Sequence, residues 1–181
     1  MYRLLTGVLA IDCVIGLCAL VQVDAEPVGR QILLPGPRLI RYRTPGYEFT
    51  LRDDGSLAIR ASGPTETGTP VDYTCTTSVV SAFMGLFSLA FSDEFLRSEK
   101  EYLPRKGTFE YHGHDLRKTI SVESPPGKEM HRVTFSDVPV LAPPASIKAV
   151  EREFDRLVWV SERGRIERDC GPIPRIVIAI D

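Results

Sequence analysis

Alternating apolar and polar residues predict a β-hairpin near the start of the folded part of this chain. In residues 47–62, YEFTLRDDGSLAIRAS, the apolar positions are Phe49 and Leu51 before the central Asp-Asp-Gly-Ser and Leu57 and Ile59 after it. Every second residue of a strand points to the same side, so each arm has one apolar face. Alternation on both sides of an Asp-Gly turn is a strong short-range signal for a hairpin.

Two later segments instead repeat apolar residues at the spacing of an α-helix. The first covers residues 78–90, with Thr77 or Ser78 as its cap. The second begins at the proline pair 143–144, and Gly164 is expected to end it. Its apolar stripe is Ile147, Val150, Phe154, Leu157 and Val158, and its charged, solvated face is Glu151, Arg152, Glu153, Asp155 and Arg156.

Four more segments have the composition of strands. VDYTCTT at 71–77 precedes the first helix, and MHRVTF at 130–135 precedes the second. Between them, GTFEYHG at 107–113 and LRKTISVES at 116–124 form a second expected hairpin. The predicted order is β-β-β-α-β-β-(β)-α. Hairpins interrupted by two helices are typical of an α+β fold, in which two helices pack on one face of a mostly antiparallel sheet.

The ends of the chain set the expected domain boundaries. Residues 26–38 are rich in proline and glycine and predict a linker, which leads into a single domain over 39–163. The tail, 164–181, contains the strand-like run Ile176–Ile180, which would be an aggregation hazard if it were exposed. This run either adds a strand to the sheet or binds a partner as a strand.

Composition limits the classes of function. The chain has 181 residues, of which 43% are apolar and 25% charged, as is ordinary for a globular domain. The formal net charge is −2. Such a chain has no basic excess that would hold a nucleic-acid backbone or an acidic membrane surface, so we expect no nucleic-acid partner.

The amino terminus has the pattern of an export signal. Arg3 precedes an apolar run of about 20 residues, and Val23 and Ala25 occupy the −3 and −1 positions of a signal-peptidase site. We expect residues 1–25 to be a signal peptide, cleaved after Ala25, and the mature protein to be periplasmic or secreted. The alternative is an uncleaved membrane anchor, because the run is long enough to cross a bilayer once. Asp12, in the middle of the run, counts against both interpretations.

Two cysteines, Cys75 and Cys170, remain after removal of the signal peptide. In an exported chain they favour one disulfide bond, and two unpaired buried thiols are the alternative. The two cysteines are 95 positions apart. If only the entropy of the unfolded chain is considered, closing a loop of this length stabilises the fold by roughly 4 to 5 kcal/mol.

A histidine pair is the candidate metal site. His112 and His114 flank Gly113 in the sequence YHGHD, and Asp115 follows. Histidines at i and i+2 of a strand share a face, and imidazole and carboxylate groups bind zinc or copper, with His131 as a remote fourth ligand. The alternative is a polar hairpin turn, because Gly113 lies where two strand-like runs meet.

Motifs of common catalytic sites are missing from the sequence. It contains no G-x-S-x-G elbow, no HExxH helix, no P-loop and no G-x-G-x-x-G, so we expect no cofactor. Whether the protein is an enzyme stays open at this point, and a function without catalysis is favoured.

Four residues of the first hairpin carry a resemblance to a known family. Pro45, Tyr47, Asp54 and Gly55 keep the spacing of a P-x-Y-x6-D-G pattern. This pattern resembles the opening of an uncharacterised bacterial family of exported proteins, a domain of unknown function whose members begin with CFGxCP.

The resemblance extends over about residues 40–160. Later segments that resemble the family are Phe95, Tyr102, GHDLRKTI and IKAVEREFDRL. Ile40 and Thr44 stand where the family has its two cysteines, so whatever that cysteine pair does is absent or replaced here. The resemblance implies a similar fold and a location in the cell envelope, and it implies no activity.

Two hypotheses for the function follow. The first is a non-catalytic, exported binding or structural domain of the bacterial cell envelope, whose partner is a protein or another envelope component. The second is a metal-binding protein or metal-dependent enzyme that uses His112, His114 and Asp115.

Overall fold

The computed structural model describes residues 36–80, 83–103, 117–136 and 143–178. Its strands are β1 (Leu39–Thr44), β2 (Tyr47–Arg52), β3 (Ser56–Pro64), β4 (Pro70–Ser78), β5 (Glu101–Tyr102), β6 (Lys118–Glu123) and β7 (Glu129–Phe135). Its helices are α1 (Phe83–Ala90), α2 (Asp93–Leu96), α3 (Ala145–Arg156), the π-helical turn η2 (Leu157–Ser161) and α4 (Arg163–Cys170).

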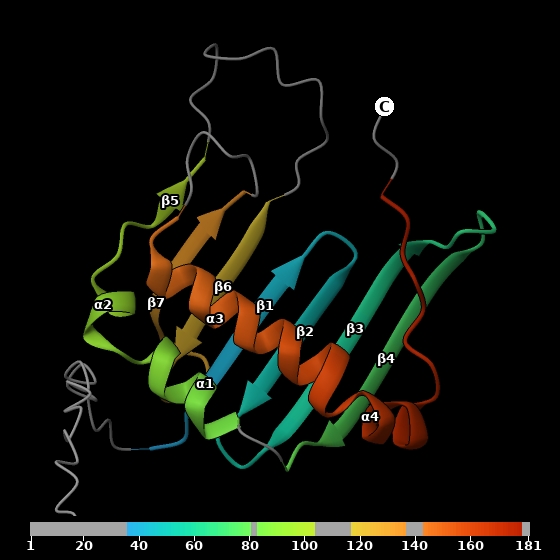
Figure 1. The fold of residues 1–181 in the computed structure, drawn as a ribbon, viewed down its shortest axis with the longest axis horizontal. Helices are drawn as coiled ribbons and strands as arrows, with labels where there is room; N and C mark the ends of the chain where they lie inside the picture. Colours follow the sequence, from blue (N-terminus) through green and yellow to red (C-terminus); the bar gives the residue numbers. More distant parts are fainter. Residues whose placement is uncertain (1–35, 81–82, 104–116, 137–142, 179–181) are drawn as a thin grey trace, which may run out of the picture.

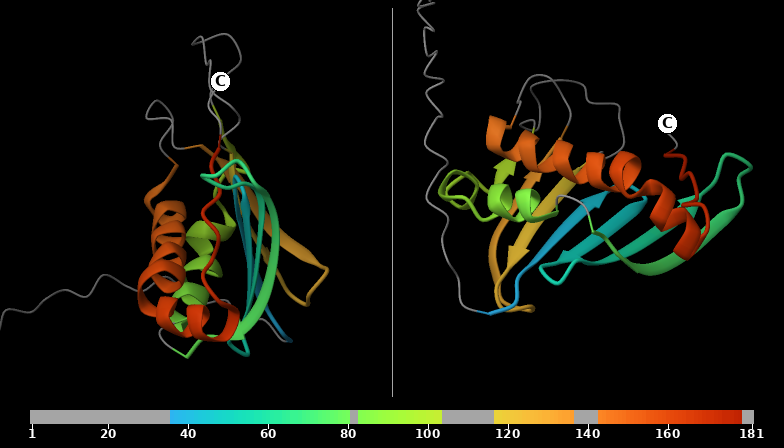
Figure 2. Two further views of the ribbon diagram at one scale, coloured as in Figure 1. Left: turned by 90° about the vertical axis from the view of Figure 1, so that its right-hand side faces the viewer. Right: turned by 60° about the horizontal axis from the view of Figure 1, so that its bottom comes forward.

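The strands form one sheet in the order β4-β3-β2-β1-β6-β7-β5 (Figure 1). All neighbours are antiparallel except the short β5, which pairs with β7 in parallel. The described helices pack on one face of this sheet (Figure 2). The predicted α+β class, with a mostly antiparallel sheet, is confirmed.

The predicted hairpin is the pair β2 and β3. Its turn is fixed by the Asp54 carboxylate, which accepts the backbone N–H of Ser56 at 2.8 Å. Gly55 has a φ of +83°, a conformation that residues with a side chain rarely adopt, and a Cβ there would lie 2.9 Å from the carbonyl oxygen of Val79. The Asp-Gly pair is thus required both by the turn and by the close approach of the chain after β4.

The second hairpin differs from the expected one. β6 is hydrogen-bonded to β1 on one side and to β7 on the other, so both of its edges are taken. The expected pairing of 116–124 with 107–113 is therefore wrong, and the hairpin is β6–β7, which turns at 124–128. Residues 107–113 themselves lie outside the described residues.

The first helix begins later than the apolar spacing predicts. β4 continues through Ser78, and among the described residues α1 starts at Phe83. The backbone N–H of Val79 donates to the carbonyl oxygen of Gly55 at 2.8 Å, so the chain just after β4 is still bonded to the β2–β3 turn. The expectation of helix from residue 78 was wrong because this bond competes with a first helical turn.

The second helical segment does not end at Gly164. α3 passes into η2 at Leu157, and α4 then begins at Arg163, so Gly164 lies in the first turn of α4. Continued helix brings Ile166 into the core, where it is 0% exposed. Burial of this side chain outweighs the small penalty of a glycine inside a helix.

The core lies between the helices and the face of the sheet that they cover. Sheet residues in it are Ile40, Tyr42, Phe49, Leu51, Leu57, Ile59, Ile120, Val122, Val133 and Phe135. Helix residues in it are Leu86, Phe87, Phe95, Ile147, Val150, Phe154 and Ile166. No helix in the described ranges is long and apolar enough to cross a membrane.

The carboxyl-terminal segment is tied to the sheet. The predicted disulfide joins Cys75 of β4 to Cys170 at the end of α4, with their Cα atoms 5.8 Å apart. The chain then runs along β3 and β4 (Figure 1), where Val177 donates its backbone N–H to the carbonyl oxygen of Pro64 at 2.8 Å. Of the strand expected at 176–180, the described residues up to 178 form a single bridge, between Ile176 and Thr65.

Candidate functional site

The face of the sheet opposite the helices is polar, and we call it the open face. Alternation places Arg41 and Arg43 there from β1, on either side of the buried Tyr42, and places Arg132 there from β7. None of the described helices covers this face (Figure 2, left). Two cross-strand rows run over it: Thr76, Ala58, Thr50, Arg41, Ser121 and Arg132, and next to them Thr74, Arg60, Glu48, Arg43, Thr119 and Thr134.

A hollow of about 100 Å³ lies where these rows cross β1, β6 and β7. We call it the arginine hollow. In the first row, the short side chain of Ser121 lies between Arg41 and Arg132 on the neighbouring strands. The lining is Arg41, Arg43, Thr119, Ser121, Arg132 and Thr134.

Carboxylates outside the hollow hold its arginines. Arg41 Nη1 lies 3.0 Å from Glu123 Oε1, and Arg41 Nε lies 3.4 Å from Glu48 Oε1. Arg43 donates its Nε–H to the other oxygen of Glu48 at 2.9 Å. Glu123 is only 5% exposed and also accepts the backbone N–H of Gly127 at 2.6 Å. These contacts place the guanidinium groups of Arg41 and Arg43 beside carboxylates at the border of the hollow.

The lining groups are suited to binding an anion. Arg132 pairs with Glu129, and each arginine has five N–H donors, of which the observed pairs occupy one or two. The hydroxyl groups of Thr119, Ser121 and Thr134 can donate as well. None of the six lining residues is a general base, so the hollow offers binding groups and no nucleophile–base pair.

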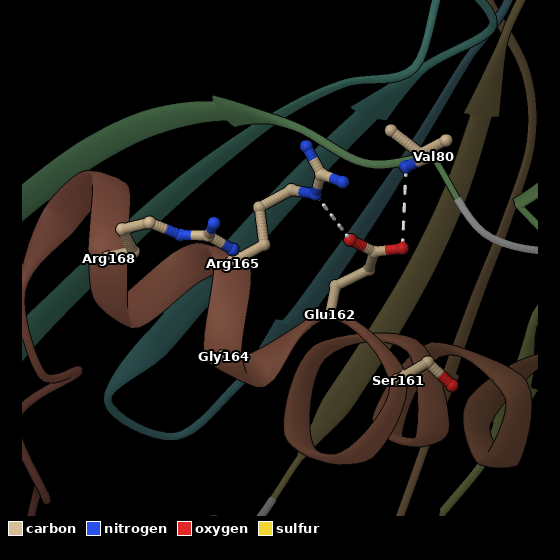
Figure 3. A pocket seen from close by; sticks show the side chains of 6 residues that line it. All are labelled: Val80, Ser161, Glu162, Gly164, Arg165 and Arg168. Atoms are coloured by element: carbon tan, nitrogen blue, oxygen red, sulfur yellow. Dashed lines mark hydrogen bonds and ion pairs between the residues drawn. The ribbon is translucent and has the colours of Figure 1, made fainter.

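A second, wider hollow of about 470 Å³ lies beside the first turn of α4 (Figure 3). Its lining is Val80, Ser161, Glu162, Gly164, Arg165 and Arg168. Glu162 is 4% exposed and accepts the backbone N–H of Val80 at 3.3 Å and Arg165 Nε–H at 3.1 Å. Its carboxylate links the end of β4 to α4, which is a structural task. A third hollow, of about 400 Å³, has Asp93 and Glu94 in its lining.

A buried ion cluster joins α3 to the sheet. Glu151 is 7% exposed, and its carboxylate lies 2.6 Å from Lys118 Nζ and 2.8 Å from Lys148 Nζ. The hydroxyl group of Tyr42 donates to it at 3.4 Å. The sequence placed Glu151 on the solvated face of the helix, and this was wrong because Lys118 projects from β6 to meet it. We assign this cluster to the stability of the helix–sheet contact.

The candidate metal ligands His112, His114 and Asp115 lie outside the described residues. The remote fourth ligand, His131, is 7% exposed on the covered face of β7, with Nε2 3.1 Å from Ser98 Oγ. Within the four described ranges, no three His, Cys, Asp or Glu side chains come together in a group that could hold a metal ion.

The metal hypothesis stays a prediction with a direct test. Metal analysis of protein purified without a histidine tag would contradict it if no stoichiometric metal were bound or taken up. A His112→Ala/His114→Ala variant is the control for the site.

Sequence reasoning missed the arginine hollow. The alternation of Arg41 and Arg43 with apolar neighbours is visible in IRYR, and that of Arg132 is visible in MHRVTF. Either pattern alone predicts only a solvated strand face. The missing information was that β6 lies between β1 and β7, which brings Arg132 level with Arg41 across Ser121.

No family model, no curated protein and no solved structure matches this chain.

Proposed function

We propose that this protein is a non-catalytic, exported binding or structural domain of the bacterial cell envelope, which holds its partner on the open face. The observation that carries the proposal is the division of the sheet into a face covered by helices and a polar, arginine-bearing face that no described helix covers. Loops carry function in many folds, but here the strands of one sheet present the polar groups.

Export is supported by two features of the chain. The amino terminus has the order of a signal peptide, with Val23 and Ala25 before the expected cleavage point. The Cys75–Cys170 disulfide is of a kind that persists in oxidising compartments such as the periplasm and is rare in the cytosol. Resemblance to the exported family with the P-x-Y-x6-D-G opening points the same way.

Cell fractionation tests the location. An antibody against the untagged protein should find it in the envelope or the medium of its native host, with Glu26 as the first residue. A cytoplasmic protein that retains residues 1–25 would contradict export. An envelope protein that retains them would be anchored.

Photo-crosslinking tests the open face as the partner surface. A photoreactive amino acid is placed either at Thr76, exposed on the open face of β4, or at Arg152, exposed on α3. We expect an envelope component to be captured from Thr76 and not from Arg152. Capture from Arg152 alone, or equally from both positions, would move the binding surface away from the open face.

A further inference from the structure

We infer that the arginine hollow binds a tetrahedral oxyanion, a phosphate or sulfate group. This inference rests on the proposed function, since it names the chemistry that the open face would recognise. Of the three hollows described above, this one is lined only by arginines and hydroxyl residues, whereas Glu162 and the pair Asp93 and Glu94 bring carboxylates into the other two.

The register of three strands builds the shape of the hollow. Ser121 lies directly between Arg41 and Arg132, and Thr119 lies between Arg43 and Thr134. Neighbouring strands are about 4.8 Å apart, so the two arginines of the first row start about 10 Å from each other. Short hydroxyl side chains on β6 form the floor, and the longer guanidinium groups form the walls.

Donor groups on the floor and the walls match an oxyanion. A guanidinium group binds phosphate and carboxylate oxygens through parallel N–H donors, and such charged hydrogen bonds are about twice as strong as neutral ones. Arg41 Nε, which is buried, lies within ion-pair distance of Glu48 but makes no hydrogen bond to any described residue. A volume of about 100 Å³ suits one small group and is well below the size of sites for drug-like molecules.

The charges around the arginine hollow favour weak, salt-sensitive binding of an anion. Glu48, Glu123 and Glu129, outside the hollow, equal the three arginines in number and balance their formal charge. Arg60, beside Glu48 in the second row, adds one more positive charge to the open face. We therefore expect an affinity in the millimolar range that weakens as the ionic strength rises, because the site is open to solvent.

The experiment is a titration of the purified protein with inorganic phosphate and with sulfate, followed by the backbone amide NMR signals. We expect saturable shifts centred on β1, β6 and β7. Arg132→Gln removes one wall, and Thr134→Val removes one hydroxyl donor at nearly constant shape. Arg132→Gln should weaken binding about tenfold and Thr134→Val about threefold.

Arg60→Gln is the matched control, because it removes the same charge from the same face two strands away from β1. Its affinity should stay within about twofold of the unmodified protein, since exposed charges are screened over such distances. An equal loss in Arg60→Gln and Arg132→Gln would overturn the inference, because binding would then reflect the general charge of the face.

Two further arms identify the ligand. Acetate should bind clearly more weakly than phosphate, and equal binding would overturn a tetrahedral site. Glucose 1-phosphate tests whether the natural ligand is a phosphate group on a larger molecule or the free ion. Tighter binding of glucose 1-phosphate indicates the former, tighter binding of inorganic phosphate indicates the latter, and both results support the site. Saturable binding of neither phosphate nor sulfate would overturn the inference while a cross-link from Thr76 still upheld the proposed function.

Discussion

The two faces of the sheet are made by the same strands and differ in what holds their residues in place. Ile40 and Tyr42 of β1 are buried under the helices, whereas Arg41 and Arg43 between and after them face the other way. Burial of a large apolar side chain contributes about 1.5–3 kcal/mol, whereas an exposed ion pair contributes at most about 1 kcal/mol. The covered face therefore specifies the fold, and the open face is free to serve a ligand.

Adjacent substitutions in β2 give the sharpest test of this difference. Phe49 is 2% exposed and packs against Tyr42 and Phe154, with ring centroids 6.2 and 5.9 Å away. Phe49→Ala should lower the free energy of unfolding by about 3–5 kcal/mol, because it leaves a cavity in the core. Its neighbour Thr50 points to the open face, and Thr50→Ala should cost less than about 1 kcal/mol.

Urea unfolding followed by circular dichroism measures both changes. Phe49→Leu provides a milder core substitution if the alanine variant does not fold. Equal losses in Phe49→Ala and Thr50→Ala would mean that the open face contributes to stability as much as the core does.

The parts of the fold that sequence patterns could predict are those fixed by local chemistry. The Asp54-Gly55 turn and the apolar stripe of α3 were both visible, since each depends on residues close in the chain. β1 was not recognised as a strand, although Ile40 and Tyr42 alternate with arginines, because it directly follows the proline- and glycine-rich segment 26–38 that predicted a linker. Its position in the centre of the sheet depends on pairing with β6, about 80 residues away, which no local pattern encodes.

The candidate site shows the same limit more strongly. Arg43 and Thr119 are neighbours only because β1 and β6 pair, and Thr134 joins them only through β7. Each residue alone is ordinary for a solvated strand. The cysteine pair could be predicted because the expected removal of residues 1–25 leaves two cysteines, which allow one pairing. Arginines are too common for such a count to be informative.

Removal of the disulfide, which lies at the β4 edge of the covered face, has the next largest expected effect on the free energy of unfolding. Cys75 lies on the edge strand β4, and its bond to Cys170 ties α4 and the segment after it to the sheet. Cys75→Ser/Cys170→Ser should lower the free energy of unfolding by about 2–4 kcal/mol, because the unfolded chain gains freedom.

Reduced protein with the natural cysteines is the matched control for the double variant and should unfold at nearly the same urea concentration. Mass spectrometry before and after reduction should show a mass increase equal to two hydrogen atoms, one on each thiol. Detection of two free thiols in protein prepared under oxidising conditions would contradict the bond.

Gly46, in the turn between β1 and β2, tests how closely the carboxyl-terminal segment is packed. A Cβ on Gly46 would lie 2.6 Å from Ile176 Cγ2 and 2.9 Å from its Cβ. Gly46→Ala should cost about 1–3 kcal/mol more than Gly68→Ala, because overpacking is added to backbone strain. Gly68 has a similar φ, +76° against +82°, and a Cβ there would meet no atom within 4 Å, so it isolates the backbone effect.

Thermal or urea unfolding of the two alanine variants gives the difference directly. Equal losses would show that Ile176 moves away at no cost, and the segment after α4 would then be only loosely attached to the covered face.

The smallest effect that we expect is a pH dependence from His131, the titratable group at the β7 side of the covered face. Burial lowers the pKa of His131 below its usual 6.5, the nearby positive charge of Lys100 lowers it further, and Glu129 partly opposes both. In the pH window just below 6.5 the unfolded chain therefore binds more protons at this residue than the folded chain. The contribution of neutral His131 to the free energy of unfolding is fully present above pH 6.5. It is lost as the pH falls through the lowered pKa of the folded state.

Unfolding by urea between pH 7.5 and about 5 measures this loss as a decrease in the free energy of unfolding on acidification. His131→Gln has no titrating ring and can still hydrogen-bond to Ser98, so its decrease over the same range should be smaller than that of the unmodified protein. Other groups titrate equally in both proteins, and the difference between the two curves isolates His131. If the free energy of unfolding depended on pH in the same way in both proteins, protonation of His131 would not destabilise the fold, and its burial on the covered face would carry no penalty.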